Sequence, residues 1–212
     1  MDRKTFLKSA AAVSTFTVLS PQTAFTYRTN SAIRMGIVGC GNRGTAVISS
    51  FLKKTDTVIT AMADLLEDKL QAALPRFNAA NALNGYPEIQ GKSVYRGSKA
   101  YLRLLSGQNV DAVLISSPAY THADFLTAAA EAGKHFYCEK PVSPDVHGCL
   151  KAEKAGTEYD GRLSMAIGFQ IRYASPYVEM IRRIRRGDIG ELISSELHYI
   201  SSGSSIKEKE GI

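Results

Sequence analysis

The stretch MGIVGCGNRGTAVISSFL, Met35–Leu52, places three glycines between a short apolar run and a segment whose apolar residues recur at helical spacing. The apolar run is typical of a buried parallel strand, so the glycines lie where a strand passes into a helix. In the pattern G-x-G-x-x-G, Gly39 permits a tight turn, Gly41 lets a pyrophosphate approach the backbone, and Gly44 lets helix and strand pack closely. A dinucleotide site is predicted here; a purely structural glycine turn is the alternative.

A second apolar run, TVITAMAD, ends on Asp64, about twenty residues beyond the loop. A carboxylate at that position binds the hydroxyls of the adenosine ribose. It also repels a 2′-phosphate, which favours NAD over NADP. Arg43, beside Asn42 in the loop, can bind a phosphate and keeps NADP possible. Asn42 and Arg43 are predicted to bind the coenzyme together with the glycines.

Strand and helix patterns alternate along the rest of the chain, which predicts an α/β fold: a Rossmann-type, doubly wound parallel sheet covered on both faces. Pro75 is expected to end the second helix, and residues 78–97 to be mainly loop. Thr121 and Ser143 are the expected N-caps of two later helices. The expected strands are 33–39, 57–64, 94–95, 110–117, 134–141 and 162–170, and the expected helices are 42–52, 65–75, 98–106, 122–133, one from 143 onward, and 177–186.

Three domains are expected: a leader at 1–32, an NAD(P)-binding domain at 33–165, and the beginning of an α+β domain at 166–212. The leader opens with Arg3, Lys4 and Lys8 before a weakly apolar stretch, and resembles a twin-arginine export signal with lysine as the second basic residue. That favours a periplasmic location; a disordered or cytoplasmic leader is the alternative. The stretch ELISSELHYIS, 191–201, alternates as a half-exposed strand does.

Composition excludes several other classes of function. The net charge of +6 includes four arginines in IRRIRRG, which we interpret as the solvated face of a helix rather than a nucleic-acid site. No segment is apolar enough to cross a membrane. Cys40, Cys138 and Cys149 match neither a zinc spacing nor a disulfide framework, so no metal is predicted, and Cys40 and Cys138 are expected to fill small buried spaces rather than act in redox chemistry.

The segment GKHFYCEKPVSPD places Glu139, Lys140 and Pro141 at the end of a predicted strand. Open α/β sheets bind ligands at the carboxyl ends of their strands. A lysine there can donate a hydrogen bond, stabilise a developing oxyanion or pass a proton. A surface ion pair followed by a turn proline is the alternative interpretation.

Three segments together resemble the Gfo/Idh/MocA oxidoreductases: GIVGCGNRG, the stretch from VDAVLISSP to CEKPVSPD, and GFQIRYASPYVEMIRRIRRGDIGEL. The resemblance covers about residues 33–200. It implies that Lys140 is catalytic and contacts both the nicotinamide and a substrate hydroxyl, while Glu139 and Pro141 shape its position. It also implies that residues of three further segments border the coenzyme: Ser117 and Pro118, His122, and Arg172.

The resemblance further implies hydride transfer between NAD (NADP possible) and a carbinol carbon of a sugar, polyol or sugar derivative, in a homo-oligomer formed through the second-domain sheet. An NAD-dependent glycosidase of the same superfamily and a non-catalytic NAD-binding module are the alternatives. The family's second domain carries D-x-x-x-H, yet none of His122, His135, His147 and His198 has an aspartate four positions earlier. We therefore expect a C-terminally incomplete member that binds coenzyme with little turnover of its own.

Overall fold

The computed structural model of the chain describes residues 31–169 and 171–200. The predicted export leader, apart from its last two residues, lies outside this range. The chain divides into two compact units, one ending at Gly168 and one beginning at Phe169, and each is described by itself. Among the described residues, no helix combines the length and the apolar character that a membrane span requires.

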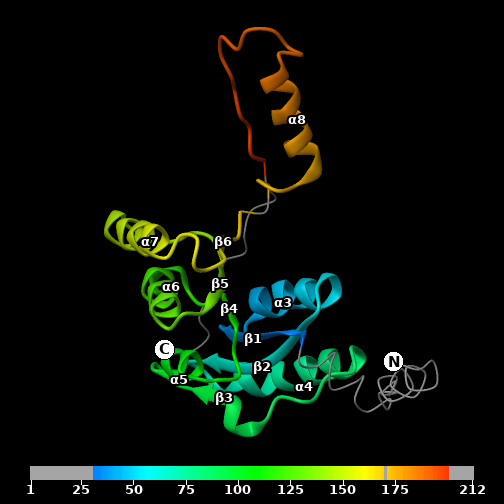
Figure 1. Cartoon of the computed structure of the whole chain (residues 1–212), viewed down its shortest axis with the longest axis vertical. Coiled ribbons are helices and arrows are strands. Elements are labelled where there is room, and N and C mark those ends of the chain that lie inside the picture. The colour runs from blue at the N-terminus through cyan, green and yellow to red at the C-terminus, as the bar shows by residue number, and fades with distance from the viewer. Residues whose placement is uncertain (1–30, 170, 201–212) are drawn as a thin grey trace, which may run out of the picture. The chain divides into compact units, whose positions relative to one another are not determined.

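The first unit is built on one parallel sheet of six strands in the order β3-β2-β1-β4-β5-β6 (Figure 1). Chain order reverses between β1 and β4, and in sheets of this kind ligands bind in the crevice at that reversal. The predicted Rossmann-type doubly wound sheet is confirmed. Its strands are β1 (Ile33–Val38), β2 (Thr57–Asp64), β3 (Val94–Arg96), β4 (Ala112–Ile115), β5 (His135–Cys138) and β6 (Met165–Ile167).

Helices cover both faces of this sheet, because its strands are apolar on both sides. One face carries α3 (Asn42–Lys54) and α4 (Glu67–Leu83), and the other carries α5 (Ala100–Leu105), α6 (His122–Glu131) and α7 (Val146–Glu158) (Figure 1). Successive side chains of β1 point to opposite faces of the sheet. Ile37 packs in the core beneath α3 and α4, and Val38 packs in the core beneath α5, α6 and α7. Two short 3₁₀ turns, η1 (Gly91–Ser93) and η2 (Ala119–Thr121), complete the unit.

The prediction that Pro75 ends a helix is wrong, because α4 continues through it to Leu83. Pro75 is exposed, so the carbonyl that it leaves without an intrahelical donor can face water. Beyond it, Phe77 is buried in the core, and the buried Asn81 amide bonds the β2 backbone at Ile59 in both directions, at 3.1 and 2.8 Å. These tertiary contacts outweigh the local cost of the proline.

Of the two predicted N-caps, Thr121 does occupy the N-cap position of α6, whereas Ser143 does not occupy that of α7. Thr121 directs its hydroxyl at the carbonyl of Pro118, 2.8 Å away, and makes no capping bond to α6. The cap of α7 is Asp145 rather than Ser143, since its carboxylate accepts from the Gly148 amide at 2.7 Å. In each case a competing bond within the preceding turn decides the outcome.

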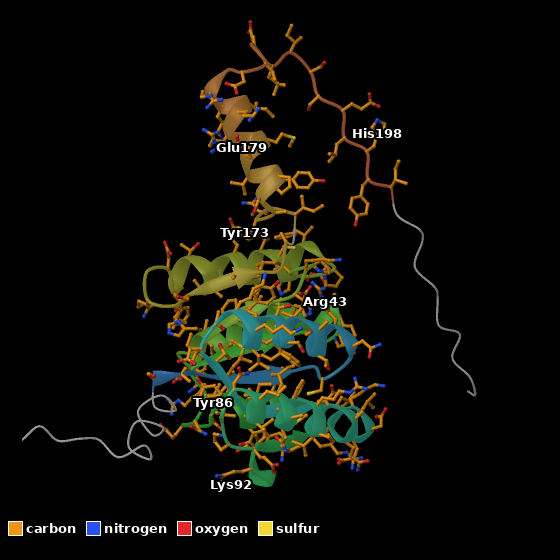
Figure 2. All side chains as sticks on the ribbon, turned by 90° about the vertical axis from the view of Figure 1, so that its right-hand side faces the viewer. Arg43, Tyr86, Lys92, Tyr173, Glu179 and His198 are labelled. Atoms are coloured by element: carbon orange, nitrogen blue, oxygen red, sulfur yellow. The ribbon has the colours of Figure 1, made fainter. Side chains whose placement is uncertain are left out.

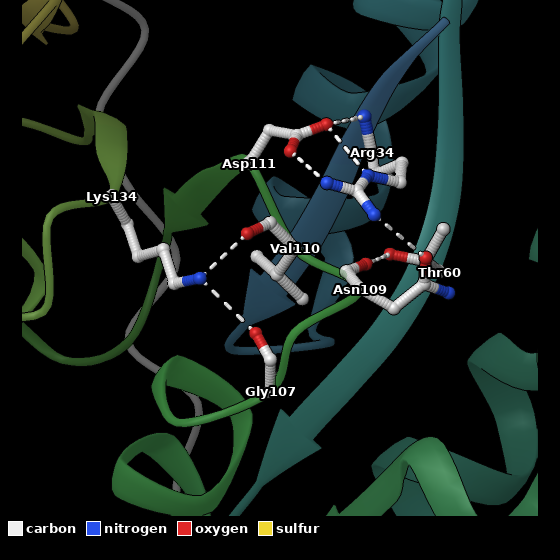
Figure 3. A network of polar contacts seen from close by, with 7 residues as sticks. All are labelled: Arg34, Thr60, Gly107, Asn109, Val110, Asp111 and Lys134. Atoms are coloured by element: carbon white, nitrogen blue, oxygen red, sulfur yellow. Dashed lines mark hydrogen bonds and ion pairs between the residues drawn. The ribbon is translucent and has the colours of Figure 1, made fainter. Parts of the chain in front are cut away.

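Polar contacts tie the amino ends of the strands together (Figure 3). The Arg34 guanidinium pairs with the Asp111 carboxylate, which also accepts from the Arg34 amide at 2.9 Å. The Thr60 hydroxyl donates to the Asn109 carbonyl at 2.5 Å, and the Lys134 ammonium donates to two backbone carbonyls at 2.8 and 3.1 Å. These contacts join β1, β2 and the segments that lead into β4 and β5. They lie away from the glycine loop, toward the amino ends of the strands.

The second unit contains α8 (Ser175–Arg186), which ends at the predicted residue and is followed by Gly187 in the left-handed conformation. On α8, Glu179 accepts hydrogen bonds from Arg182 and Arg183 (Figure 2). The strand predicted at 191–201 is not formed over the described part, 191–200. A strand exists through hydrogen bonds to a neighbouring strand, and no described strand pairs with this segment.

Candidate functional site

The glycine loop connects β1 to α3 through a close approach of backbones. Gly39 has a φ of +94°, and a Cβ there would lie 2.6 Å from the backbone of Ser116 and Ser117. A Cβ on Gly44 would lie 2.1 Å from the Gly39 carbonyl oxygen. A Cβ on Gly41 would meet no described atom within 4 Å. The fold itself therefore requires Gly39 and Gly44, whereas Gly41 leaves the start of α3 open to a ligand.

Asp64 ends β2 and turns its carboxylate toward this loop. One carboxylate oxygen accepts from the Cys40 amide at 2.7 Å and the other from the Leu66 amide at 3.0 Å. A carboxylate offers about four acceptor sites, so others are left for hydroxyl groups of a ligand. Two backbone bonds thus fix this acceptor beside the start of α3.

A cavity of about 650 Å³ opens at this edge, within the size range of small-molecule sites. Five of the predicted coenzyme residues line it: Gly39, Gly41, Asp64, Ser117 and Pro118. The other lining residues include two lysines and two aromatic residues that were not predicted and that no sequence motif distinguishes: Lys69, Lys99, Tyr101 and Phe125. The rings of Tyr101 and Phe125 stack at 3.9 Å between centroids. A larger cavity of about 1070 Å³ lies at the amino ends of the strands, away from the loop.

Glu139 follows β5, and its buried carboxylate lies 2.8 Å from the guanidinium of Arg43 in the first turn of α3 (Figure 2). Arg43 therefore reaches toward β5, not toward Asp64 on the other side of β1. The Tyr137 hydroxyl is a second partner of Glu139, and burial together with that carboxylate raises the pKa of Tyr137. An ion pair does form in this segment, as the alternative interpretation had it, but it involves the buried Glu139 and not Lys140.

Lys140 is exposed and makes neither a hydrogen bond nor an ion pair with any residue that the structure describes. Its neighbour Pro141 carries a carbonyl 2.6 Å from Nδ1 of His122, while Nε2 of His122 lies 2.7 Å from the Ser117 carbonyl. His122 is buried and bridges two turns rather than lining the cavity. Asn42 begins α3 outside the cavity wall. Arg172 belongs to the second unit, and its place near the coenzyme stays a prediction.

Cys40 and Cys138 are buried, as predicted, and burial raises the pKa of each thiol to about 12. Cys149 is exposed. Within residues 31–169 and 171–200, no group of three or more histidine, cysteine, aspartate or glutamate side chains is arranged to hold a metal ion.

Comparisons with known proteins agree with this architecture. The chain is 31% identical over 159 residues to inositol 2-dehydrogenase 3 of Saccharopolyspora erythraea, covering 74% of the chain and 42% of that protein. It is 28% identical over 172 residues to inositol 2-dehydrogenase of Salmonella typhimurium, covering 80% and 47%. A glycosyl hydrolase family 109 protein of a Shewanella strain is 27% identical over 218 residues, covering 93% and 46%. The chain thus spans less than half the length of these relatives.

Among solved structures, a 3-ketoreductase from Actinomadura kijaniata in complex with NADP superimposes with a TM-score of 0.56 at 26% identity, covering 76% of this chain and 46% of that one. The scyllo-inositol dehydrogenase of Lactobacillus casei with bound NAD(H) and scyllo-inositol shares the fold, with a TM-score of 0.59 at 22% identity and coverage of 76% and 43%. Residues 33–167 match GFO_IDH_MocA, described as "Oxidoreductase family, NAD-binding Rossmann fold". The chain belongs to this oxidoreductase family, and its first unit is the NAD-binding Rossmann domain.

Proposed function

We propose that this protein transfers a hydride between NAD and a carbinol carbon of a polyol of the inositol class or of a related sugar. The proposal depends on the position of Lys140. Its exposed amine has no partner among the described residues, and it lies at the carboxyl ends of the strands, where the glycine loop also lies. The family assignment and the relatives named inositol dehydrogenases support the same chemistry.

The coenzyme's diphosphate would rest on the bare backbone at Gly41 and the amino end of α3, where unpaired amides and the helix dipole favour an anion. Asp64 would accept hydrogen bonds from the adenosine ribose, and Ser117 and Pro118 would border the coenzyme. NAD is favoured over NADP because Asp64 repels a 2′-phosphate and the Arg43 guanidinium is already paired with Glu139. A 2′-phosphate would instead have to be met by other cations of the cavity wall.

When bound, the nicotinamide ring supplies hydride chemistry. The residues of this chain would move the proton and stabilise the negative charge on the substrate oxygen. The Lys140 amine would donate a hydrogen bond to that oxygen, stabilise the negative charge that develops on it, and carry its proton to or from solvent. Because the 212 residues contain no D-x-x-x-H sequence, we propose that this chain alone binds coenzyme with little turnover.

Calorimetry of the purified chain with NADH, NAD⁺, NADPH and NADP⁺ tests the coenzyme assignment, and no heat with any of them would refute it. Turnover is measured in the natural protein that carries these residues, as NADH formed from myo-inositol or scyllo-inositol. Lys140→Met should abolish turnover and retain NADH binding. Lys154→Met, on the exposed side of α7, is the control.

The same assays separate the other two functions. Release of nitrophenol from an aryl glycoside without net formation of NADH would identify an NAD-dependent glycosidase. Coenzyme binding without turnover of either substrate class in the natural protein would identify a non-catalytic binding module.

We also propose that residues 1–32 direct export. The order Arg3-Lys4 before a weakly apolar stretch supports this. Recovery of the mature protein from the cytoplasm with Met1 retained would contradict it.

A further inference from the structure

We propose that Arg43 and His122 are positioning residues that together fix the backbone on both sides of Lys140. Each lies in the first turn of a different helix, Arg43 in α3 and His122 in α6. Arg43 is bonded to the residue before Lys140 and His122 to the residue after it. This inference rests on the proposed catalytic role of Lys140.

On the amino side of Lys140, the contact is an ion pair to a buried carboxylate. Glu139 is 4% exposed, and a carboxylate at that depth is costly unless it is paired. The Arg43 guanidinium, 2.8 Å away, supplies the charge. The Glu139 amide also donates to the Ile115 carbonyl at 2.9 Å, which continues the pairing of β5 with β4. The ion pair therefore links the glycine loop to the position of Lys140.

On the carboxyl side, the contact is a histidine held between two carbonyl oxygens. His122 is 2% exposed, with the Pro141 carbonyl 2.6 Å from Nδ1 and the Ser117 carbonyl 2.7 Å from Nε2. A neutral ring donates to one of these acceptors, and a ring with hydrogen on both nitrogens donates to both. With hydrogen on both nitrogens the imidazole hydrogen-bonds the turn after β4 and the turn after β5, whereas a neutral ring hydrogen-bonds one turn and only contacts the other.

The two contacts matter because Lys140 has no anchor of its own among the described residues. A lysine ammonium moves on a flexible four-carbon stem, so the volume that it samples depends on how firmly its backbone is held. Misplacement of a reacting group by about 1 Å can cost roughly 100-fold in rate. Arg43 would therefore act on the Lys140 side of the coenzyme, and not as a ligand of the adenosine phosphate.

Hydrogen exchange of the coenzyme-free chain tests this directly, since a residue that only contacts coenzyme would leave the free protein unchanged. In Arg43→Met and His122→Phe, peptides covering 138–142 should exchange roughly tenfold faster, while peptides from β2 and α4 should not change. Asp124→Asn is the matched control, because it removes an ion pair between α6 and α7 that touches neither Glu139 nor Pro141. It should leave 138–142 unchanged.

A second readout follows Lys140 itself. After reductive ¹³C-methylation of the lysines, the resonance missing from Lys140→Arg is assigned to Lys140. In Arg43→Met and His122→Phe this resonance should move while the other lysine resonances stay, and Arg43→Lys should return it toward its original position. A general loss of stability would move many resonances together.

Glu139→Gln weakens the same ion pair with little change in side-chain shape. If Arg43→Met or His122→Phe does not fold, Glu139→Gln and Arg43→Lys are used for the same two measurements instead. Folded variants with unchanged exchange at 138–142 and an unchanged Lys140 resonance would overturn the inference. Both readouts use coenzyme-free protein, so a failure to bind NADH would instead overturn the proposed function.

Discussion

Replacing Gly44 by alanine should destabilise the first unit, while replacing Gly41 should leave its stability nearly unchanged. The added methyl group of Gly44→Ala would lie 2.1 Å from the Gly39 carbonyl oxygen and 3.3 Å from the Ile37 side chain. Ordinary carbon–oxygen contacts are about 3.3–3.6 Å, so the backbones must separate by about 1.2 Å. Gly39 cannot easily yield, since its amide is bonded to the Ala63 carbonyl at 2.9 Å.

Overpacking of this kind costs about 1–3 kcal/mol and occasionally more. Alanine returns about 0.5–1 kcal/mol as the better helix former. Because two backbone segments must move, we expect the upper part of the range, a net loss of about 2–3 kcal/mol. For a domain of this size that corresponds to a fall in Tm of roughly 4–12 °C.

Gly41→Ala meets no described atom, so its smaller effects on helix capping and on the unfolded chain should cancel to within about 0.5 kcal/mol. Its methyl group would, however, cover the backbone that we propose for the diphosphate, and affinity for NADH should fall at least about tenfold, or 1.4 kcal/mol. Urea unfolding followed by circular dichroism measures the first effect and calorimetry with NADH the second. A Gly44→Ala protein as stable as the original would refute the close approach of helix and strand. Normal NADH binding by Gly41→Ala would refute the proposed diphosphate position.

Three further results are expected. The Arg34 guanidinium lowers the pKa of Asp111, so the pair stabilises the fold fully above the carboxyl's usual pKa and loses this effect as pH falls through the lowered pKa. Asp111→Asn should cost about 1 kcal/mol at pH 7, because both groups are over a third exposed. In urea unfolding, the difference from the original protein should begin to shrink near the usual pKa and vanish only below the lowered one. With a thiol-labelling reagent at pH 8, Cys149 should react at once and the two buried cysteines only on unfolding, because a pKa of about 12 leaves roughly one thiolate in ten thousand; early labelling of three thiols would contradict their burial. Asn81→Leu should cost about 1–3 kcal/mol, since it strands a buried donor and acceptor of β2, and an unchanged urea midpoint would contradict that account.

The alternation of strands and helices, the glycine loop and the acid after β2 were predictable because each depends on residues close together in the sequence. The failures involve partners far away. Pro75 is tolerated inside α4 because of packing against the sheet, and the strand expected at 191–201 had no described neighbour to pair with. Local patterns state what a segment prefers, and tertiary contacts decide whether that preference is realised.

The site shows the same division. The sequence predicted which residues lie at the carboxyl edge, but not which of them touch. Arg43 and Glu139 are 96 positions apart, and their ion pair leaves no local signal. His122 was predicted to border the coenzyme, whereas both its ring nitrogens face backbone carbonyls. No sequence motif indicated that Tyr101 and Phe125 would stack in the cavity wall.

The polar contacts around Arg34 and Asp111 lie at one end of strands whose other end holds the proposed coenzyme site, about 15 Å away along β1. Substitutions that far apart generally contribute independently to the energy of a protein. Substitutions that raise thermal stability can therefore accumulate at one end of the sheet while the opposite end changes its ligand. A scaffold divided in this way can diversify its substrates without forfeiting its ability to fold.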